Sequence, residues 1–437
     1  MYNEKYRPQF HFTAKTHWLN DPNGCVYYDG TYHLFFQHNP KGLKWGNMTW
    51  GHAVSPDLVH WQQVEHAIHP YDGGTIFSGT AAVDAGNDSK LGTGITPPLV
   101  AAFTHAKKPF GQAIAFSNDH GGTWELYANG KHVVPNQGLN DSERDPKIFR
   151  HEPSGKWVMV LYTQKGQARF FTSDDLLQWE HVSDFEGEGF FECPDLIQLP
   201  LDGNPQETKW VLHDAPFNYW IGSFDGKTFT ADTGPFKGDQ GNNFYAAQTW
   251  NNTDDRVVQI GWMRGGNYPD MPFNQQMSFP CELSLRTTPR GVRLCRMPVQ
   301  EISSLYLTRD SVKQHTLEPG TPLEIGGPGE LFDLEMEVVV SPESSFSIRV
   351  CGQEITWAGG RVTCLGKERG LPASGDVVNL RLLADRTSIE LFGNRGEVSM
   401  SSCFLAPDQV ERVRMSVAQG NVAIRSLTLR KLASVWT

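Results

Sequence analysis

A repeated Ser-x-Asp signature followed by an aromatic residue is the feature that most constrains the fold of this chain. It occurs four times, at residues 55–61, 117–124, 173–179 and 223–229. The copies lie about 50 to 60 residues apart, the spacing typical of one four-stranded blade of a β-propeller. We interpret the Asp as part of a hairpin turn and the aromatic residue as packing between neighbouring sheets. The alternative is a series of unrelated hairpin turns in another all-β fold.

Short segments between these copies have the composition of strands. They are rich in β-branched and aromatic residues and bounded by Gly, Pro, Asn or Asp: Thr31 to Gln37, Leu99 to Thr104, Trp157 to Tyr162 and Val257 to Trp262. A radial stack of such sheets brings the inner strand of each sheet to a central axis. Residues distant in sequence would then line one funnel.

Three acidic residues stand beside prolines and are candidates for that funnel. Asp21 lies in Asn20-Asp21-Pro22-Asn23, where the proline fixes the backbone and the asparagines can bond a ligand hydroxyl. We predict a short, rigid turn and regard Asp21 as a candidate nucleophile. Alone, this segment could be an ordinary Asx turn before a strand.

The other two acids differ in their neighbours. Asp145 lies between Arg144 and Pro146, and a neighbouring arginine is expected to keep it ionised. Glu192 lies between aromatic residues and Pro194, and an apolar setting favours a protonated carboxyl, as a general acid requires. Such a set matches the needs of a retaining glycosidase: a nucleophile, an electrostatic stabiliser and a proton donor. Taken singly, each could be a solvated surface acid.

The blocks around these acids resemble glycoside hydrolase family 32, the β-fructofuranosidases that include invertases, inulinases and levanases. Trp18 to Gly24 resembles the family's nucleophile block, Arg144 to Pro146 its stabiliser block, and Glu192 to Asp195 its acid/base block, in the family's order. The stretches Lys44 to His52 and Tyr245 to Trp250 resemble the exo-inulinase and exo-levanase branch.

The resemblance implies a fold and a set of roles. It implies a five-bladed β-propeller followed by a C-terminal β-sandwich. Asp21 would be the nucleophile, Glu192 the acid/base and Asp145 the transition-state stabiliser. Further residues would bind the fructosyl unit: Asn20, Gln37, Trp45, Phe77, Ser78, Arg144 and Trp262. Amides and hydroxyls can satisfy sugar hydroxyls, and Trp faces can pack against the ring; the alternative for Trp45 and Trp262 is a place in the inter-blade core.

We therefore expect a retaining, exo-acting β-fructosidase that releases fructose from levan or inulin, and from sucrose. The open alternatives are a sucrose-preferring invertase, a fructosyltransferase, an endo-fructanase, or a five-bladed arabinan or xylan hydrolase. A noncatalytic carbohydrate-binding propeller could have lost the acids, whereas all three are present. The chemistry requires neither a cofactor nor a metal. Linkage preference depends on loops that the sequence does not resolve.

The character of the chain changes near residue 300, where the aromatic signature ends. Beyond it come alternating segments separated by Gly, Pro, Asp and Asn, the pattern of a β-sandwich. We predict a propeller over residues 1–300, a linker over 301–312 and a sandwich over 313–437. The sandwich is expected to cover the flank of the propeller rather than bind sugar.

Composition excludes several other classes. The chain of 437 residues carries a net charge of -11, which disfavours nucleic-acid binding and favours a neutral substrate. The chain has no run of about 18 apolar residues, so the sequence predicts no membrane span. The seven cysteines are scattered and are expected to be mostly free, buried thiols.

The N-terminal segment lacks an apolar leader; we expect a secreted or periplasmic protein whose leader is absent from this chain, with the cytoplasm as the alternative. The oligomeric state is left open.

Overall fold

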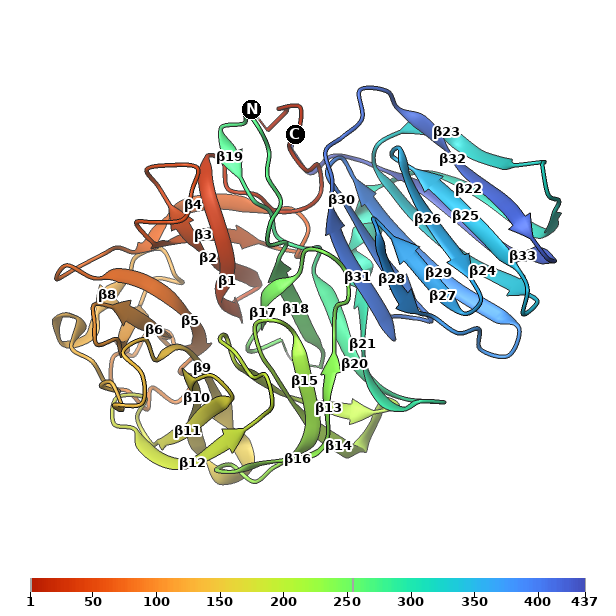
Figure 1. Ribbon diagram of the computed structural model, residues 1–437. Coiled ribbons are helices and arrows are strands. Elements are labelled where there is room, and N and C mark those ends of the chain that lie inside the picture. Colours follow the sequence, from red (N-terminus) through yellow and green to blue (C-terminus); the bar gives the residue numbers. More distant parts are fainter. Residues whose placement is uncertain (1, 254, 437) are drawn as a thin grey trace.

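The computed structural model describes residues 2–253 and 255–436 and is built almost entirely of β-strands. Figure 1 shows two bodies side by side: sheets arranged around a centre in the red-to-green part of the chain, and a blue C-terminal part of packed sheets. The predicted all-β architecture, a propeller followed by a β-sandwich, is confirmed.

The first half of the propeller comprises two sheets of consecutive antiparallel strands. The first contains β1 (His17–Tyr28), β2 (Thr31–Asn39), β3 (Thr49–Ser55) and β4 (Gln62–Ile68), with β19 (Phe273–Asn274) parallel to β1. The second contains β5 (Thr75–Val83), β6 (Leu99–Ala106), β7 (Gly111–Ser117) and β8 (Glu125–Leu126), followed by the 3-10 helix η1 (Tyr127–Gly130).

The second half contains one four-stranded and one eight-stranded sheet. The former has β9 (Arg144–His151), β10 (Lys156–Gln164), β11 (Gln167–Ser173) and β12 (Glu180–Glu186), with the 3-10 helix η2 (Glu152–Ser154) between β9 and β10. The latter has β13 (Asp195–Leu201), β14 (Asn204–His213), β15 (Asn218–Phe224), β16 (Phe229–Lys237), β17 (Tyr245–Thr249), β18 (Val257–Trp262), β20 (Cys281–Thr288) and β21 (Gly291–Pro298). Leu201 and Leu285 join its two halves by a single parallel pair, so the count of five blades stays a prediction.

The Ser-x-Asp signature forms the turn between the third and fourth strands of four successive strand groups. In the first copy, the Ser55 hydroxyl donates to Asp57, whose Oδ1 also accepts the backbone N–H groups of Val59 and His60. The indole N–H of Trp61 then donates to the carbonyl of Leu58. The predicted hairpin turns are confirmed, and their cause is local: one carboxylate satisfies the backbone donors of the turn.

The C-terminal body consists of two six-stranded sheets. One has the order β22 (Tyr306–Leu317), β33 (Val422–Leu432), β24 (Phe332–Val340), β29 (Val377–Asp385), β30 (Ser388–Gly393), β31 (Val398–Cys403). The other has the order β23 (Leu323–Gly329), β32 (Glu411–Gln419), β25 (Ser345–Val350), β26 (Gln353–Ala358), β27 (Arg361–Cys364), β28 (Lys367–Gly370). Their inward side chains form one buried core that includes Leu334, Ile348 and Trp357.

The junction between the two bodies is more structured than the predicted linker over 301–312. Residues Gln300–Leu305 form the 3-10 helix η3, and β22 already begins at Tyr306. The first half of β22 therefore occupies most of the range that we predicted as linker. The alternation there was hard to recognise because β22 is largely exposed on both faces.

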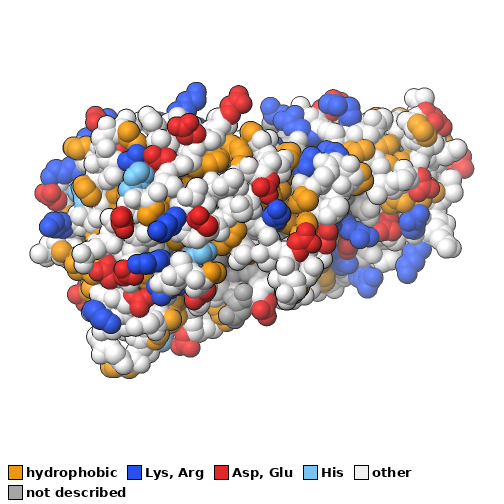
Figure 2. Space-filling view, turned by 90° about the horizontal axis from the view of Figure 1, so that it is seen from below, with side chains coloured by type: hydrophobic (Ala, Val, Ile, Leu, Met, Phe, Trp, Pro, Cys, Tyr) orange, Lys and Arg blue, Asp and Glu red, His pale blue; other side chains and the backbone are white. Residues whose placement is uncertain are grey.

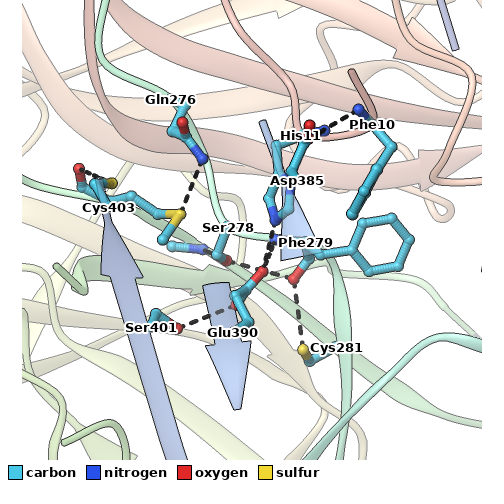
Figure 3. Close-up of polar contacts among 12 residues, drawn as sticks. Phe10, His11, Gln276, Ser278, Phe279, Cys281, Asp385, Glu390, Ser401 and Cys403 are labelled. Carbon is cyan, nitrogen blue, oxygen red and sulfur yellow. Dashed lines mark hydrogen bonds and ion pairs between the residues drawn. The ribbon is translucent and has the colours of Figure 1, made fainter. Parts of the chain in front are cut away.

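A buried polar cluster joins the N-terminal segment, the propeller and the sandwich. Figure 3 shows His11 between two carboxylates of the sandwich. Its Nδ1 lies 2.8 Å from Asp385 Oδ2 and its Nε2 2.9 Å from Glu390 Oε1. Glu390 also accepts the backbone N–H of Phe279, which precedes β20. The two bodies are thus held together by specific bonds as well as by apolar packing around Phe279, Leu383 and Phe392.

The surface shows no large field of one charge on the face seen in Figure 2, where positive and negative side chains intermingle over the propeller. All seven cysteines are free, and five of them are buried, as predicted. Among the residues described here, no helix has the length and apolarity needed to cross a bilayer.

Candidate active site

A cavity of about 460 Å³ is lined by residues from the successive propeller sheets. All ten residues that we predicted for the site line it: Asn20, Asp21, Gln37, Trp45, Phe77, Ser78, Arg144, Asp145, Glu192 and Trp262. The structure therefore brings the whole predicted set together.

Asp21 and Asp145 reach the cavity through β-bulges, not through the Pro-marked turns that we predicted, whereas Glu192 lies in the bend that precedes β13. In β1, Leu19 pairs with His38 and Pro22 with Phe36, so that Asn20 and Asp21 together face the single residue Gln37. A bulge of this kind bends the strand and re-aims its side chains. Pro22 directly follows this bulge and pairs with Phe36.

Three further strands carry the same irregularity at the cavity. Register shifts place residues 77–78 of β5, residues 145–146 of β9 and residues 246–247 of β17 opposite one residue of the neighbouring strand. The first two of these bulges present Phe77, Ser78 and Asp145 to the cavity. Repeated bulges at one end of the strands therefore build the site.

Two of the acids also have left-handed backbone conformations. The φ angle is +65° at Asp145 and +56° at Glu192, and Cys193 follows at +40°. Such angles are unfavourable for residues with a Cβ and persist where the surrounding structure imposes them, often at functional sites. Here the bulge in β9 and the entry into β13 impose them.

Asp21 is held by two donors. The Ser78 hydroxyl donates to Oδ2 at 2.8 Å and the Asn20 amide to Oδ1 at 3.1 Å. Trp18 fixes Asn20 in turn, because its indole N–H donates to the Asn20 Oδ1 at 2.8 Å. Burial raises the pKa of Asp21, the two bonds lower it, and the nearby Glu192 raises it again, with an increase as the net result.

Asp145 is buried beside Cys193, whose backbone N–H donates to Oδ2 at 3.1 Å. The prediction that Arg144 keeps this acid ionised is wrong in its net effect. Burial raises the pKa of Asp145 to about 7; the arginine, with Nε 3.8 Å from Oδ2, lowers it, while the charges of Glu192 and Asp21 raise it. Burial and the charges of Glu192 and Asp21 together raise this pKa more than Arg144 lowers it, because Arg144 contacts Glu192 more closely.

Glu192 is the acid that Arg144 contacts most closely. An Arg144 Nη2 lies 2.5 Å from Glu192 Oε1, and the Tyr245 hydroxyl donates to Oε2 at 2.6 Å. The predicted apolar setting of Glu192 is therefore wrong, because both oxygens have polar partners. The aromatic neighbour Phe191 lines the cavity instead, 5.9 Å from the Arg144 guanidinium.

The aromatic residues divide between the rim and the wall. Trp45 is 59% exposed and packs edge-on against Phe77, so it belongs to the rim and not to inter-blade core. Trp262 is only 9% exposed and belongs to a buried cluster, yet it also lines the cavity. Its indole N–H donates to Gln275, which fixes the orientation of the ring.

Three residues lining the cavity were absent from the predicted set: Phe191, Tyr245 and Arg264. Tyr245 lies in a segment that the sequence marked without giving it a role. Arg264 lies in the turn that directly follows β18, two residues after Trp262. That spacing was the available signal for Arg264.

The space behind the carboxylates is nearly closed. A void of only about 10 Å³ remains there, bounded by Pro22, Asp145, Cys193 and Gln248. A space of this size holds about one water molecule at most. The cavity is therefore blind at the carboxylate end.

Comparison with known proteins decides the family. A model described as the glycosyl hydrolases family 32 N-terminal domain matches residues 11–298, and the family's C-terminal model matches residues 354–431. The chain belongs to glycosyl hydrolase family 32. It is thus a glycoside hydrolase, and the resemblance seen in the sequence is confirmed.

Individual relatives extend this result. The levanase of Bacillus subtilis (strain 168) is 39% identical, in an alignment that covers the whole chain and 72% of the levanase. The extracellular exo-inulinase InuE of Aspergillus niger is 33% identical across the whole chain and 96% of its own length.

Solved structures show the same architecture. The exo-inulinase from Aspergillus awamori superposes with a TM-score of 0.90 at 30% identity, covering all of both chains. The fructofuranosidase from Schwanniomyces occidentalis in complex with fructose gives a TM-score of 0.89 at 27% identity over 99% of each chain.

Proposed function

We propose that this family 32 hydrolase is a retaining, exo-acting β-fructosidase that releases fructose from β-fructans and from sucrose. The levanase, the exo-inulinases and the fructofuranosidase that it resembles support this activity. The single observation that carries the proposal is the convergence of Asp21, Asp145 and Glu192 on one blind cavity.

In the first step, Asp21 attacks the anomeric carbon C2 of the terminal fructosyl unit and forms a covalent fructosyl–enzyme ester. Glu192 donates its proton to the glycosidic oxygen as the bond to the leaving group breaks. In the second step, Glu192 takes a proton from water, and the water oxygen attacks C2 and releases Asp21. Two inversions give net retention.

The contacts of each acid suit these roles. Asn20 and Ser78 hold the Asp21 carboxylate in one orientation, as an in-line attack needs. Arg144 and Tyr245 hold both oxygens of Glu192, which fixes the orientation of this side chain in the cavity.

We assign Asp145 to the fructosyl 3- and 4-hydroxyls. Its Oδ2 accepts a hydrogen bond from the backbone N–H of Cys193. Two sugar hydroxyls would supply the donors that this buried acid otherwise lacks and would favour its ionised form. Their bonds would tighten as positive charge develops on the ring, which stabilises the transition state more than the ground state.

The closed end of the cavity supports attack at chain ends. A polymer cannot thread past the carboxylates into a void of about 10 Å³. The cavity of about 460 Å³ suits a terminal sugar with its neighbour. The exposed Trp45 at the rim is positioned to stack on sugar as it enters.

For the compartment, we propose secretion or export to the periplasm. The support is that the exo-inulinases among the relatives are named as extracellular.

The test is a time course of products from levan, inulin and sucrose, with Asp21→Asn as the blank. Fructose alone from the earliest time on a polymer is the expected result, and the initial rates rank the linkages. A ladder of oligosaccharides would contradict exo attack. No product from any of the three would contradict the proposed function as a whole.

A further inference from the structure

Arg264 is a cavity residue that the proposed mechanism does not use. It follows β18, is exposed to solvent and lines the cavity together with Tyr245 and Trp262. Its guanidinium carbon lies 4.6 Å from the centre of the Tyr245 ring and 5.9 Å from that of Trp262. The guanidinium is therefore seated on aromatic surfaces at the mouth of the site and not free in solvent.

The position of Tyr245 tells which side of the cavity Arg264 occupies. The Tyr245 hydroxyl donates to Glu192 Oε2 at 2.6 Å. In a retaining hydrolase the general acid lies on the side of the departing group, whereas the nucleophile lies across the anomeric carbon from it. Arg264 contacts the ring of Tyr245, and Tyr245 contacts Glu192. Arg264 hence borders the space of the leaving group.

The two arginines of the cavity differ in their partners. Arg144 pairs with Glu192. Within residues 2–253 and 255–436, Arg264 makes no ion pair, and its interactions there are the two aromatic contacts and a backbone carbonyl bond to Asn243. Its five N–H donors, in a planar fork, remain available to oxygen atoms in the cavity.

We propose that Arg264 is a specificity-determining residue that binds neighbouring hydroxyls of the leaving sugar, the fructosyl or glucosyl unit beyond the cleaved bond. The inference rests on the proposed function, since it assigns one side of that same site. A neutral sugar with adjacent hydroxyls offers two acceptors to the fork. The aromatic contacts restrict the arginine beforehand, which lowers the entropy lost on binding.

The test compares substrates that differ only in the leaving group. Arg264→Gln should lower kcat/KM for sucrose and for inulin by about tenfold or more, mainly through KM, because bonds from a charged donor are lost. Fructosyl fluoride has no leaving sugar, so its kcat/KM should change by about twofold at most. Arg264→Lys keeps the charge but not the fork and should fall between the two.

Arg290→Gln is the matched control, because Arg290 lies on the hairpin between β20 and β21 and pairs with Glu397 away from the cavity. It should leave all substrates unchanged. An equal loss on fructosyl fluoride and sucrose would overturn the inference, since Arg264 would then act on the fructosyl unit or on the fold. A loss confined to kcat on sucrose, with KM unchanged, would also overturn it, since Arg264 would then act through Tyr245 and the proton donor Glu192. An Arg264→Gln variant whose kcat/KM is unchanged on every substrate would overturn the inference as well. In that case the activity of the wild type would leave the proposed function standing. A wild type inactive on every substrate would overturn both.

Discussion

Two groups of buried carboxylates in this protein face opposite electrostatic conditions. Asp385 and Glu390, at the junction of propeller and sandwich, lie against His11. Burial alone would raise the pKa of both, but the hydrogen bonds and charge of His11 lower it overall. In the cavity, burial raises the pKa of Asp21 and Asp145, and their partners do not offset it.

The difference lies in how many donors each acid receives. Asp385 accepts the backbone N–H groups of Gln9, Phe10 and His11 in addition to the imidazole. Asp145 accepts the N–H of Cys193 and a weak contact from its thiol. Asp385, which stabilises the fold, is saturated with partners, whereas Asp145 in the site keeps acceptor capacity for a substrate, at some expense of stability.

The largest effect is expected from removing the acid/base. Glu192→Ala should reduce kcat on sucrose and fructans by about 10³-fold, within the range for general acid–base catalysis, without unfolding the protein. Fructosyl fluoride needs no protonation, so the first step on it should be far less affected. Steady-state and burst kinetics on both substrates measure this. An equal loss in the first-step rate on both would exclude Glu192 as the acid.

A smaller effect, on stability, is expected at the junction. His11→Ala leaves two buried carboxylates without their cation and should lower the free energy of unfolding by about 3–5 kcal/mol. Urea denaturation at pH 7 measures it. His60→Ala is the control, because His60 pairs with Asp57 at the surface and should cost about 1 kcal/mol or less. Similar losses for both variants would show that the buried contacts of His11 stabilise the fold no more than a surface pair does.

The pH dependence of that loss sharpens the comparison. The hydrogen bonds to Asp385 and Glu390 raise the pKa of His11 to about 9 against the opposing effect of burial. A raised histidine pKa gives stability that is fully present below the unfolded value of about 6.5 and is lost as pH rises through 9. The difference between wild type and His11→Ala should therefore shrink by about 2–3 kcal/mol between pH 6.5 and 10, and a constant difference would contradict it.

The smallest effect is a gain of stability in the site. The pKa of Asp145 is raised to about 7, so the folded state binds more protons than the unfolded state between about pH 4 and 7, and stability falls as pH rises through that window. Asp145→Asn removes the buried charge and should raise the free energy of unfolding at pH 8 by about 2 kcal/mol while abolishing turnover. Thermal melts at pH 4 and pH 8 test this. A variant less stable than wild type at pH 8 would show that the buried Asp145 carboxylate does not destabilise the fold.

The sequence predicted those features that depend on neighbours along the chain. The Ser-x-Asp turns could be recognised because the Ser, the Asp and the aromatic residue interact within one short segment. The membership of the site could also be predicted, since the ten residues lie in blocks that resemble one family. Here the resemblance added what composition and spacing could not.

Features that depend on pairing across space escaped prediction. The bulges at Asp21 and Asp145 arise from the register between strands, which no local pattern specifies. Arg144 adjoins Asp145 in sequence, yet its guanidinium reaches Glu192, 48 residues further on. The net pKa of Asp145 follows from burial and from two distant acids, so a neighbouring arginine was a poor guide to it.

The assignment of Asp21 as the nucleophile of a retaining β-fructosidase is tested most directly by trapping the covalent intermediate. Glu192→Gln lacks the base for the second step, whereas fructosyl fluoride bypasses the need for the acid in the first. Mass spectrometry of the quenched reaction should show one fructosyl unit attached to the peptide that contains Asp21, and Asp21→Asn should lack it. A fructosyl unit on any other residue, or turnover without an adduct in both proteins, would contradict the assignment.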